Sequence, residues 1–370
     1  MFVMLIILVV IDTTKIAGIP ATKRVQNDQN RVDSDILYRY ICYMKHISIL
    51  VPEDAVLAAI DDPRVMFTAV NDFLQETGQP LLFDVKLTGL SKEVRLHDRS
   101  FSVHTDILAK DVRHTDLIII PALGRNIDHA LEVNKELIKW VTAQHKKGAE
   151  VASLCSGAFF LAKTGLLNGK TCSTHWIHAN SFRKMFPEVT LAEGKIITEE
   201  KGIYTSGGAT SYWNLLLYLT EKFAGREMAI RTSKYFMLDM DRSNQSQFII
   251  FKGQKEHEDE TIKKAQDFIE ANFQDKITID QLAATFAVGR RNFERRFKKA
   301  TSNTVIEYIQ RVKIEAAKMS LESSRENVNE VVYHAGYTDP KAFRTTFKKI
   351  TGLSPLQYRN KYNREAQISL

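Results

Sequence analysis

The chain has 370 residues, of which 44% are hydrophobic and 26% charged. This length suits two or three domains with cores of their own, and the composition excludes both wholesale disorder and a polytopic membrane protein. A formal net charge of +7 is a mild basic excess whose meaning depends on where it lies. The three cysteines are too few and too scattered for a disulfide framework or a four-cysteine zinc site. We therefore expect no metal, no cofactor and a reducing, cytoplasmic location.

The sequence pattern of residues 1–43 is not typical of a folded domain. The apolar run MFVMLIILVVI at the start has no preceding Lys or Arg and is shorter than the roughly 18 residues that span a bilayer. The polar residues that follow show no period, whereas a strand-like run begins directly after Met44. We predict that 1–43 is a poorly structured extension, with the native start at Met44. The alternative, a short membrane tether, is disfavoured by the missing positive flank.

From residue 46 to about 225, short β-branched runs alternate with helical segments, and we place the domain that they form at 44–250. The runs DLIIIP and EVASL, at 116–121 and 150–154, are continuously apolar, which is typical of strands buried on both faces. The alternation predicts an α/β domain with a doubly wound, mostly parallel sheet. The predicted strands are 46–51, 81–87, 116–121 and 150–154, and the predicted helices are 65–74 and 128–146.

The remainder of the chain is expected to be all-α. We place a polar linker at 251–260, a helical domain at 261–362 and a tail at 363–370. An ungapped offset of 50 residues aligns this domain with itself, so a supersecondary unit occurs twice. Each copy predicts a short helix, a break and a second helix. The aligned pairs include Phe293 with Phe343, Phe297 with Phe347 and Tyr308 with Tyr358, and the capping signals are Thr278 with Gln281 and Asn327 with Glu330.

The second helix of the first copy, GRRNFERRFKK at 289–299, carries a local net charge of +5. A basic helix face is often no more than solvated surface. Here the repeated helix-turn-helix context favours DNA binding, because major-groove recognition needs basic and amide side chains near the start of such a helix.

Residues 259–362 resemble the AraC/XylS family of bacterial transcription regulators. The resemblance is most specific in AGYTDPKAFRTTFKKITGLSPLQYRN at 335–360, and ITIDQLAATFAVGRRNFERRF at 277–297 matches the first unit. Gly289 departs from the serine cap that is common in the family. The resemblance implies that helices at 290–300 and 340–350 enter successive major grooves about 34 Å apart, joined by a helix at 304–320. The double-stranded operator then holds two half-motifs per monomer.

The exposed residues near each helix start are the expected base readers, and the lysines further along are expected to contact phosphates. The base readers are Arg291, Asn292, Arg295, Lys341, Arg344 and Thr345, and the phosphate contacts are Lys298, Lys299, Lys348 and Lys349.

Cys155 follows an apolar strand in ASLCSGAFF at 152–160, which is the arrangement of a nucleophile elbow. The start of the next helix would favour its thiolate, and His175 lies twenty residues further on. The alternative is a buried, inert cysteine.

This domain resembles the ThiJ/PfpI (glutamine-amidotransferase-like) superfamily, which implies a flavodoxin-like fold. Ser156 stands where protease-like members have a catalytic histidine, IIIPALG lacks the Gly-Gly of an oxyanion site, and Ala58 occupies the usual acidic position. We therefore predict no catalytic residue and a pocket at the carboxyl ends of the strands. Its candidate lining residues are Cys155, Ser156, His175, Ser206 and Gly207.

The two halves together predict a sequence-specific transcription regulator. Its α/β domain would sense an unknown small molecule or form a homodimer, and RNA polymerase is a further expected partner. Two alternatives stay open: a thiol-dependent hydrolase or amidase using Cys155 and His175, and a thiol redox sensor.

Overall fold

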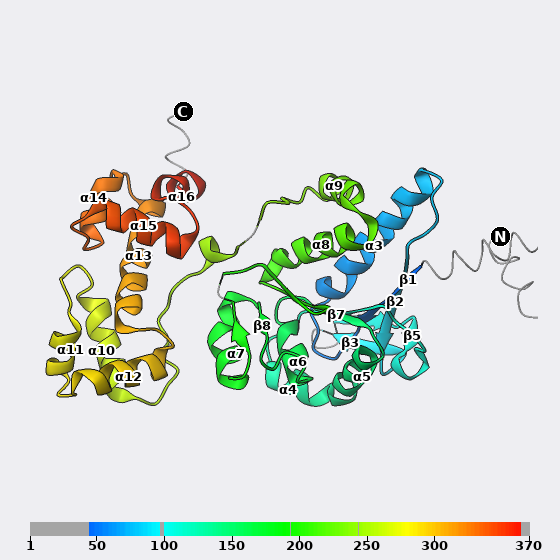
Figure 1. Ribbon diagram of the computed structural model, residues 1–370, viewed down its shortest axis with the longest axis horizontal. Coiled ribbons are helices and arrows are strands. Elements are labelled where there is room, and N and C mark those ends of the chain that lie inside the picture. Colours follow the sequence, from blue (N-terminus) through cyan, green and yellow to red (C-terminus); the bar gives the residue numbers. More distant parts are fainter. Residues whose placement is uncertain (1–43, 97–99, 193, 243, 364–370) are drawn as a thin grey trace, which may run out of the picture.

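The computed structural model describes residues 44–96, 100–192, 194–242 and 244–363. It consists of an α/β domain followed by an all-helical domain (Figure 1). The predicted extension at 1–43 lies outside the described residues. Within the described ranges, no helix has both the length and the apolar character that a membrane span requires.

A seven-stranded sheet in the order β10-β11-β7-β6-β1-β2-β5 forms the centre of the first domain. All neighbouring strands of this sheet are parallel except β10 and β11. Ile47 of β1 pairs with Val85 of β2 on one side and with Leu117 of β6 on the other. The prediction of a doubly wound, mostly parallel sheet is therefore confirmed. The strands are β1 Lys45–Leu50, β2 Phe83–Gly89, β5 Ile107–Leu108, β6 Leu117–Ile120, β7 Glu150–Ser153, β10 Ile197–Glu200 and β11 Ile203–Ser206, with the smaller pairs β3 Glu93–Leu96 with β4 Phe101–His104 and β8 Thr171–Cys172 with β9 Thr190–Leu191.

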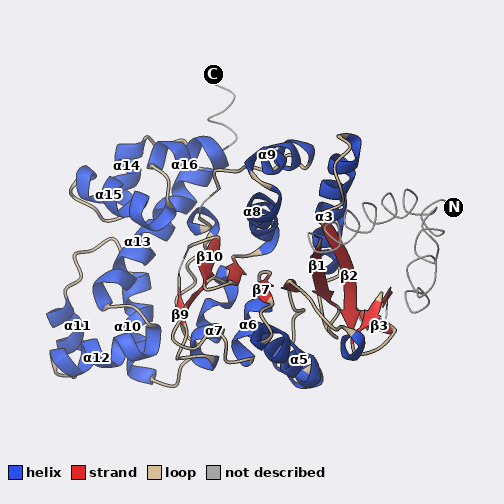
Figure 2. Cartoon of the chain, turned by 45° about the vertical axis from the view of Figure 1, so that its right-hand side comes forward, coloured by secondary structure: helices blue, strands red, loops and turns tan. Residues whose placement is uncertain are grey.

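Helices cover both faces of this sheet (Figures 1 and 2). One buried cluster joins the sheet to α3 and α8 through residues such as Phe67 and Leu216, and a second joins it to α5 and α6 through residues such as Val141 and Phe160. The helix predicted at 128–146 is divided at Asn134, whose buried amide bonds the backbone of Glu53. The helices are α3 Ala58–Glu76, α4 Ile127–Val133, α5 Lys135–Lys146, α6 Gly157–Lys163, α7 Ala179–Met185, α8 Tyr212–Ala224 and α9 Arg226–Tyr235.

The second domain has two small cores joined by one long helix, α13. Val305 and Tyr308 at its start belong to the first core, and Ile314 and Leu321 further along belong to the second. This is the predicted repeat of helix, turn and helix. The helices are α10 Glu260–Ala271, α11 Ile279–Thr285, α12 Arg290–Thr301, α13 Val305–Ser323, α14 Val328–His334, α15 Pro340–Thr351 and α16 Pro355–Tyr362.

The predicted linker and tail pack against neighbouring structure. Phe251 lies against Tyr308 with ring centroids 5.2 Å apart, so the start of the 251–260 segment contributes to the first helical core. Asn363, placed in the tail, is buried and donates from Nδ2 to the carbonyl oxygens of Leu321 and Ser324 at 3.1 and 3.0 Å.

Candidate nucleic-acid interface and ligand pocket

Helix α12 turns its basic side chains outward because its apolar side chains are held in the first helical core. Phe293 and Phe297 are fully buried there. Gly289 occupies the N-cap and provides no side-chain hydrogen bond, as its departure from serine implied. All five predicted contacts on this helix are exposed: Arg291, Asn292, Arg295, Lys298 and Lys299.

Two other arginines of α12 form ion pairs with acidic residues of the helical domain. Arg290 bonds both carboxylate oxygens of Asp280 at 3.0 and 2.9 Å. Arg296 donates from Nε and Nη2 to Asp259 at 2.9 and 2.6 Å, and this pair holds the pKa of the Asp259 carboxyl below its usual value. The local charge of +5 therefore overstates what this helix offers a partner, because part of it is matched by Asp259, the N-cap of α10, and by Asp280 of α11.

Arg295 and Asn292 lie together on the exposed face. Arg295 donates from Nη2 to Asn292 Oδ1 at 2.9 Å. An Arg can bond guanine bidentately and an Asn can bond adenine, so this contact places two side chains suited to base edges side by side.

Helix α15 presents the same kind of surface. It begins with Pro340 after the N-cap Asp339, whose carboxylate accepts from the Lys341 amide at 2.8 Å. Thr345 donates to the Lys341 carbonyl at 3.0 Å. Phe343, Phe347 and Thr351 are buried, so the opposite side of the helix faces outward. All five predicted contacts on this helix are exposed: Lys341, Arg344, Thr345, Lys348 and Lys349.

The two turns match as well. Ala287 and Gly336, each the residue after the C-cap of the first helix of its unit, have positive φ angles of 53° and 73°. A Cβ at Gly336 would lie 2.6 Å from the carbonyl oxygen of Gln274, so this turn needs glycine. Lys313 of α13 donates to the Gly336 carbonyl at 2.7 Å, which ties the second turn to the connecting helix.

Cys155 sits at a sharp turn between β7 and α6, as the elbow motif predicts. Its φ is 54°, and its amide donates to Ser206 Oγ at 3.1 Å. A Cβ at Gly157 would approach the Pro121 carbonyl oxygen to 2.6 Å, so the close approach of α6 requires that glycine. The expectation of a favoured thiolate is wrong in direction. Burial raises the pKa of the Cys155 thiol and outweighs the opposing backbone contacts of Ala209 and Ser156.

The side chains of Ser156 and His175 bond other backbone groups. Ser156 Oγ accepts from the Leu123 amide and donates to the Leu123 carbonyl, both at 2.9 Å, so it fixes the loop after β6. His175 Nδ1 accepts from the Ile177 amide at 3.1 Å, and burial lowers the pKa of its imidazole. Among the described residues, Cys155 and His175 share no hydrogen bond.

An acidic side chain is connected to the surroundings of Cys155 through Tyr212, and it stands at a position that the sequence analysis did not name. Asp62 lies on α3, one turn beyond Ala58, and accepts a hydrogen bond from the Tyr212 hydroxyl. Burial raises the pKa of Asp62, and burial followed by the bond to Asp62 raises that of Tyr212. Tyr212 in turn interacts electrostatically with Cys155. A search for an acid at position 58 could not find this pair, because tyrosine and aspartate are 150 residues apart.

Gln245, in a polar stretch near the end of the α/β domain, is the second residue that was missed. It is 3% exposed and lies beside Ser206 and Gly207 at the end of β11. Its Oε1 accepts from the Gly208 amide at 3.2 Å, and its Nε2 donates to the Thr174 carbonyl at 2.9 Å. The hydrophilic surroundings of Gln245 in the sequence gave no sign that it is buried.

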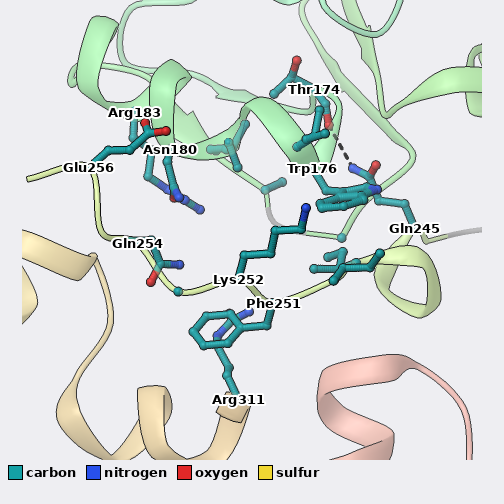
Figure 3. Close-up of a pocket in the computed structure, with 18 residues that line it drawn as sticks. Thr174, Trp176, Asn180, Arg183, Gln245, Phe251, Lys252, Gln254, Glu256 and Arg311 are labelled. Carbon is teal, nitrogen blue, oxygen red and sulfur yellow. Dashed lines mark hydrogen bonds between the residues drawn. The ribbon is translucent and has the colours of Figure 1, made fainter. Parts of the chain in front are cut away.

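A cavity of about 280 Å³ lies beyond Gln245, between α7 and the segment that leads to the helical domain (Figure 3). None of the five predicted pocket residues is among its lining residues. Thr174, Trp176, Gln245, Lys252 and Arg311 are among the residues that line it.

Comparison with known proteins identifies both domains. Residues 67–222 match the DJ-1/PfpI family, and residues 282–361 match a helix-turn-helix domain. The chain is thus a two-domain protein that joins a DJ-1/PfpI domain to a helix-turn-helix domain of the AraC type. Both resemblances drawn from the sequence are confirmed.

The similar curated proteins include HTH-type transcriptional regulators. GbdR of Pseudomonas aeruginosa is 26% identical over 224 residues, 60% of this chain and 61% of that protein. GlxA of Rhizobium meliloti is 22% identical over 56% of this chain and 64% of that protein. The chain thus matches less than two thirds of the length of these relatives. The crystal structure of an AraC family transcriptional regulator from Pseudomonas putida is 16% identical, with a TM-score of 0.44 over 52% of this chain and 99% of that one.

Proposed function

We propose that the protein is a sequence-specific DNA-binding transcription regulator of the AraC type. The observation that carries this proposal is the pair of helices α12 and α15. Each buries two phenylalanines of one small core and exposes five side chains suited to bases and phosphates. Two equivalent surfaces on one rigid connecting helix suit two successive major grooves of one duplex.

The position of a side chain along each helix decides whether it contacts bases or phosphates. Side chains near the start reach base edges, and the lysines in the last turn contact phosphates, which add affinity without sequence preference. The operator accordingly contains two half-motifs per monomer, about one helical turn or 34 Å apart. The base readers are Arg291, Asn292, Arg295, Lys341, Arg344 and Thr345, and the phosphate contacts are Lys298, Lys299, Lys348 and Lys349.

The α/β domain supplies the regulatory input and is not a source of turnover. A nucleophilic thiol needs a low pKa and a nearby base. Burial raises the pKa of Cys155. His175 Nδ1 accepts from the Ile177 amide in the 3₁₀ helix that follows it. The domain would sense a small molecule or hold two chains together, in the cytoplasm where RNA polymerase acts. The names of GbdR and GlxA as transcriptional regulators support this role.

Selection from a pool of random duplex DNA tests the proposal. The full chain is incubated with the pool at two salt concentrations, and the bound DNA is sequenced over several rounds. We expect enrichment of a site with two half-motifs about one turn apart at both salt concentrations. Binding that is sensitive to salt and blind to sequence would refute specific regulation, because phosphate contacts alone behave in that way.

A further inference from the structure

Helices α12 and α15 are held in their cores in the same way. Thr301 of α12 donates to the Phe297 carbonyl at 2.8 Å, and Thr351 of α15 donates to the Phe347 carbonyl at the same distance. Both threonines are buried, and each also bonds the carbonyl two residues further on at 3.1 Å. Each helix has 12 residues. Because corresponding residues anchor the two helices, an offset of 50 residues matches their exposed faces position by position.

The exposed lysines in the last turns are identical in the two units. Lys298 and Lys299 of α12 correspond to Lys348 and Lys349 of α15. The helices lie near opposite ends of α13 (Figures 1 and 2). Two separate segments of a duplex would therefore meet the same phosphate contacts, and any difference between the units lies near the starts of the helices.

The exposed residues near the helix starts differ in chemistry. Asn292 of α12 corresponds to Ala342 of α15, and Arg295 corresponds to Thr345. All four residues are exposed. An amide and a guanidinium in the first unit are thus matched by two side chains that end in methyl groups in the second.

Two further pairs leave a cation in both units. Arg291 corresponds to Lys341, and both can bond guanine. Glu294 corresponds to Arg344, but the Glu294 carboxylate lies 3.9 Å from Arg290 Nε on its own helix. Since either unit can contact guanine, the difference between them depends on the two pairs of the preceding paragraph.

The first unit is suited to two purines on adjacent base pairs. Arg295 Nη2 donates to Asn292 Oδ1 at 2.9 Å, which keeps the two side chains together. The Asn292 oxygen has a second lone pair and its Nδ2 keeps its hydrogens, so this amide can still bond adenine through both groups. The Arg295 guanidinium retains further donors for guanine.

The second unit is suited to thymine. Thr345 donates its hydroxyl hydrogen to the Lys341 carbonyl at 3.0 Å, so that hydrogen is engaged within the helix. The methyl groups of Thr345 and Ala342 remain as apolar surface on the exposed face. Thymine is the base that presents a methyl group in the major groove, and Ala and Thr methyl groups are its usual contacts.

We propose that the operator is asymmetric because the two units select different bases. Helix α12 selects guanine and adenine on adjacent base pairs through Arg295 and Asn292, and α15 selects thymine through Ala342 and Thr345. This assignment rests on the proposed function, because it needs both helices to lie in major grooves. Each unit is thereby assigned to its own half of the site.

Selection from random duplex DNA, with the full chain and with the double variant Asn292→Ala/Arg295→Thr, tests the asymmetry. The double variant gives α12 the exposed pair of α15. The native chain should enrich two different half-motifs, with a preference of at least about tenfold for guanine and adenine in the first. The double variant should lose that preference and gain thymine there, while its urea unfolding stays close to that of the native chain because both positions are exposed.

The possible failures differ in what they refute. If the native chain enriched no site, the proposed function would be refuted and the asymmetry with it. Two half-motifs of the same sequence would overturn the asymmetry alone and leave the regulator standing. An unchanged first half-motif in the double variant would show that Arg295 and Asn292 do not select it.

Replacing the thymine of the second half-motif by uracil tests the methyl contact, since uracil lacks only the methyl group. We expect the affinity of the native chain to fall about fourfold, the effect of one buried carbon group. The same replacement between the half-motifs is the control and should have no effect. Thr345→Ser keeps the hydroxyl but removes the methyl, so the loss on uracil should be smaller in this variant. Equal affinity of the native chain for thymine and uracil operators would overturn the assignment of thymine.

Discussion

The ring of Phe297 lies edge-on to the ring of Tyr308, with centroids 5.3 Å apart and planes at 84°. Phe347 and Tyr358 repeat this contact in the second unit at 5.4 Å and 84°. Each tyrosine hydroxyl also donates to a glutamate of a neighbouring helix, Glu270 of α10 in the first unit and Glu322 of α13 in the second. The two units are therefore alike in their side-chain packing as well as in their helices.

Phe297→Ala and Phe347→Ala should destabilise the helical domain to a similar extent. Each substitution removes a fully buried ring from a small core, so we expect a loss of about 3–5 kcal/mol in the free energy of unfolding. Urea unfolding followed by circular dichroism measures it. Ile306→Ala is the control, because Ile306 is 56% exposed and its loss should cost less than about 0.5 kcal/mol.

The double variant adds a second criterion. Phe297 and Phe347 belong to two separate cores. Their effects on the free energy of unfolding should therefore add within about 0.5 kcal/mol. A strong departure from additivity, or a large difference between the two single variants, would contradict the view of two independent, equivalent units.

The sequence predicts the features that depend on local pattern. The repeat, the capping boxes at Thr278 and Asn327, and the buried phenylalanines all follow from residue type and spacing, and the structure contains them. The short strands β8 to β11 were not predicted, since runs of two to four residues carry little periodicity.

Ion pairs and hydrogen bonds between residues far apart in the chain could not be predicted from the sequence. The partner of Arg296 is Asp259, 37 positions away, and nothing in a basic run tells which arginine is paired. The burial of Gln245 likewise depends on the loops at Thr174 and Gly208, which only the folded sheet brings together.

Asp259 should stabilise the helical domain in a pH-dependent manner. It accepts from the Ile262 amide as the N-cap of α10 and pairs with Arg296. Asn is an equally good cap but has no charge, so Asp259→Asn should cost about 1–2 kcal/mol at pH 7. Asp259→Ala should cost about 1 kcal/mol more, because the cap is lost too.

The pH dependence follows from the lowered pKa of Asp259. A carboxyl whose pKa falls on folding adds stability above its unfolded value, here 3.8, and loses it as the pH falls through the lower folded value. The difference between the native protein and Asp259→Asn should therefore shrink below pH 3.8 in urea titrations at several pH values. A difference that stays constant down to acid pH would show that the ion pair contributes nothing.

Cys155 should react slowly with thiol reagents near neutral pH. Burial raises its thiol pKa, so the reactive thiolate is scarce at pH 7 and increases as the pH rises. We expect alkylation by iodoacetamide at least about tenfold slower than in the urea-unfolded chain, with mass spectrometry to resolve the sites. Cys172, whose pKa burial raises to about 12, is the internal comparison and should be slow as well. Rapid labelling of Cys155 alone at pH 7 would revive the redox-sensor interpretation.

Arg295 and Lys349 should affect DNA binding in different ways. Arg295 lies beside Asn292 near the start of α12, where we propose that side chains reach base edges, so Arg295→Ala should cost about 1–3 kcal/mol on the selected operator and relax the preference at one position. Lys349 lies in the last turn of α15, so Lys349→Ala should weaken binding to all sequences alike and lower the salt slope by about one.

Titration of labelled operator and of random duplex at several salt concentrations distinguishes these outcomes. Arg296→Ala is the control within the same basic run, because its guanidinium is engaged by Asp259 rather than facing outward. It should lower the stability of the domain while leaving the ratio of operator to random binding unchanged. If Arg295→Ala and Lys349→Ala instead reduced binding to operator and random DNA by the same factor, the assignment of base readers and phosphate contacts would be wrong, because only a base contact discriminates between sequences.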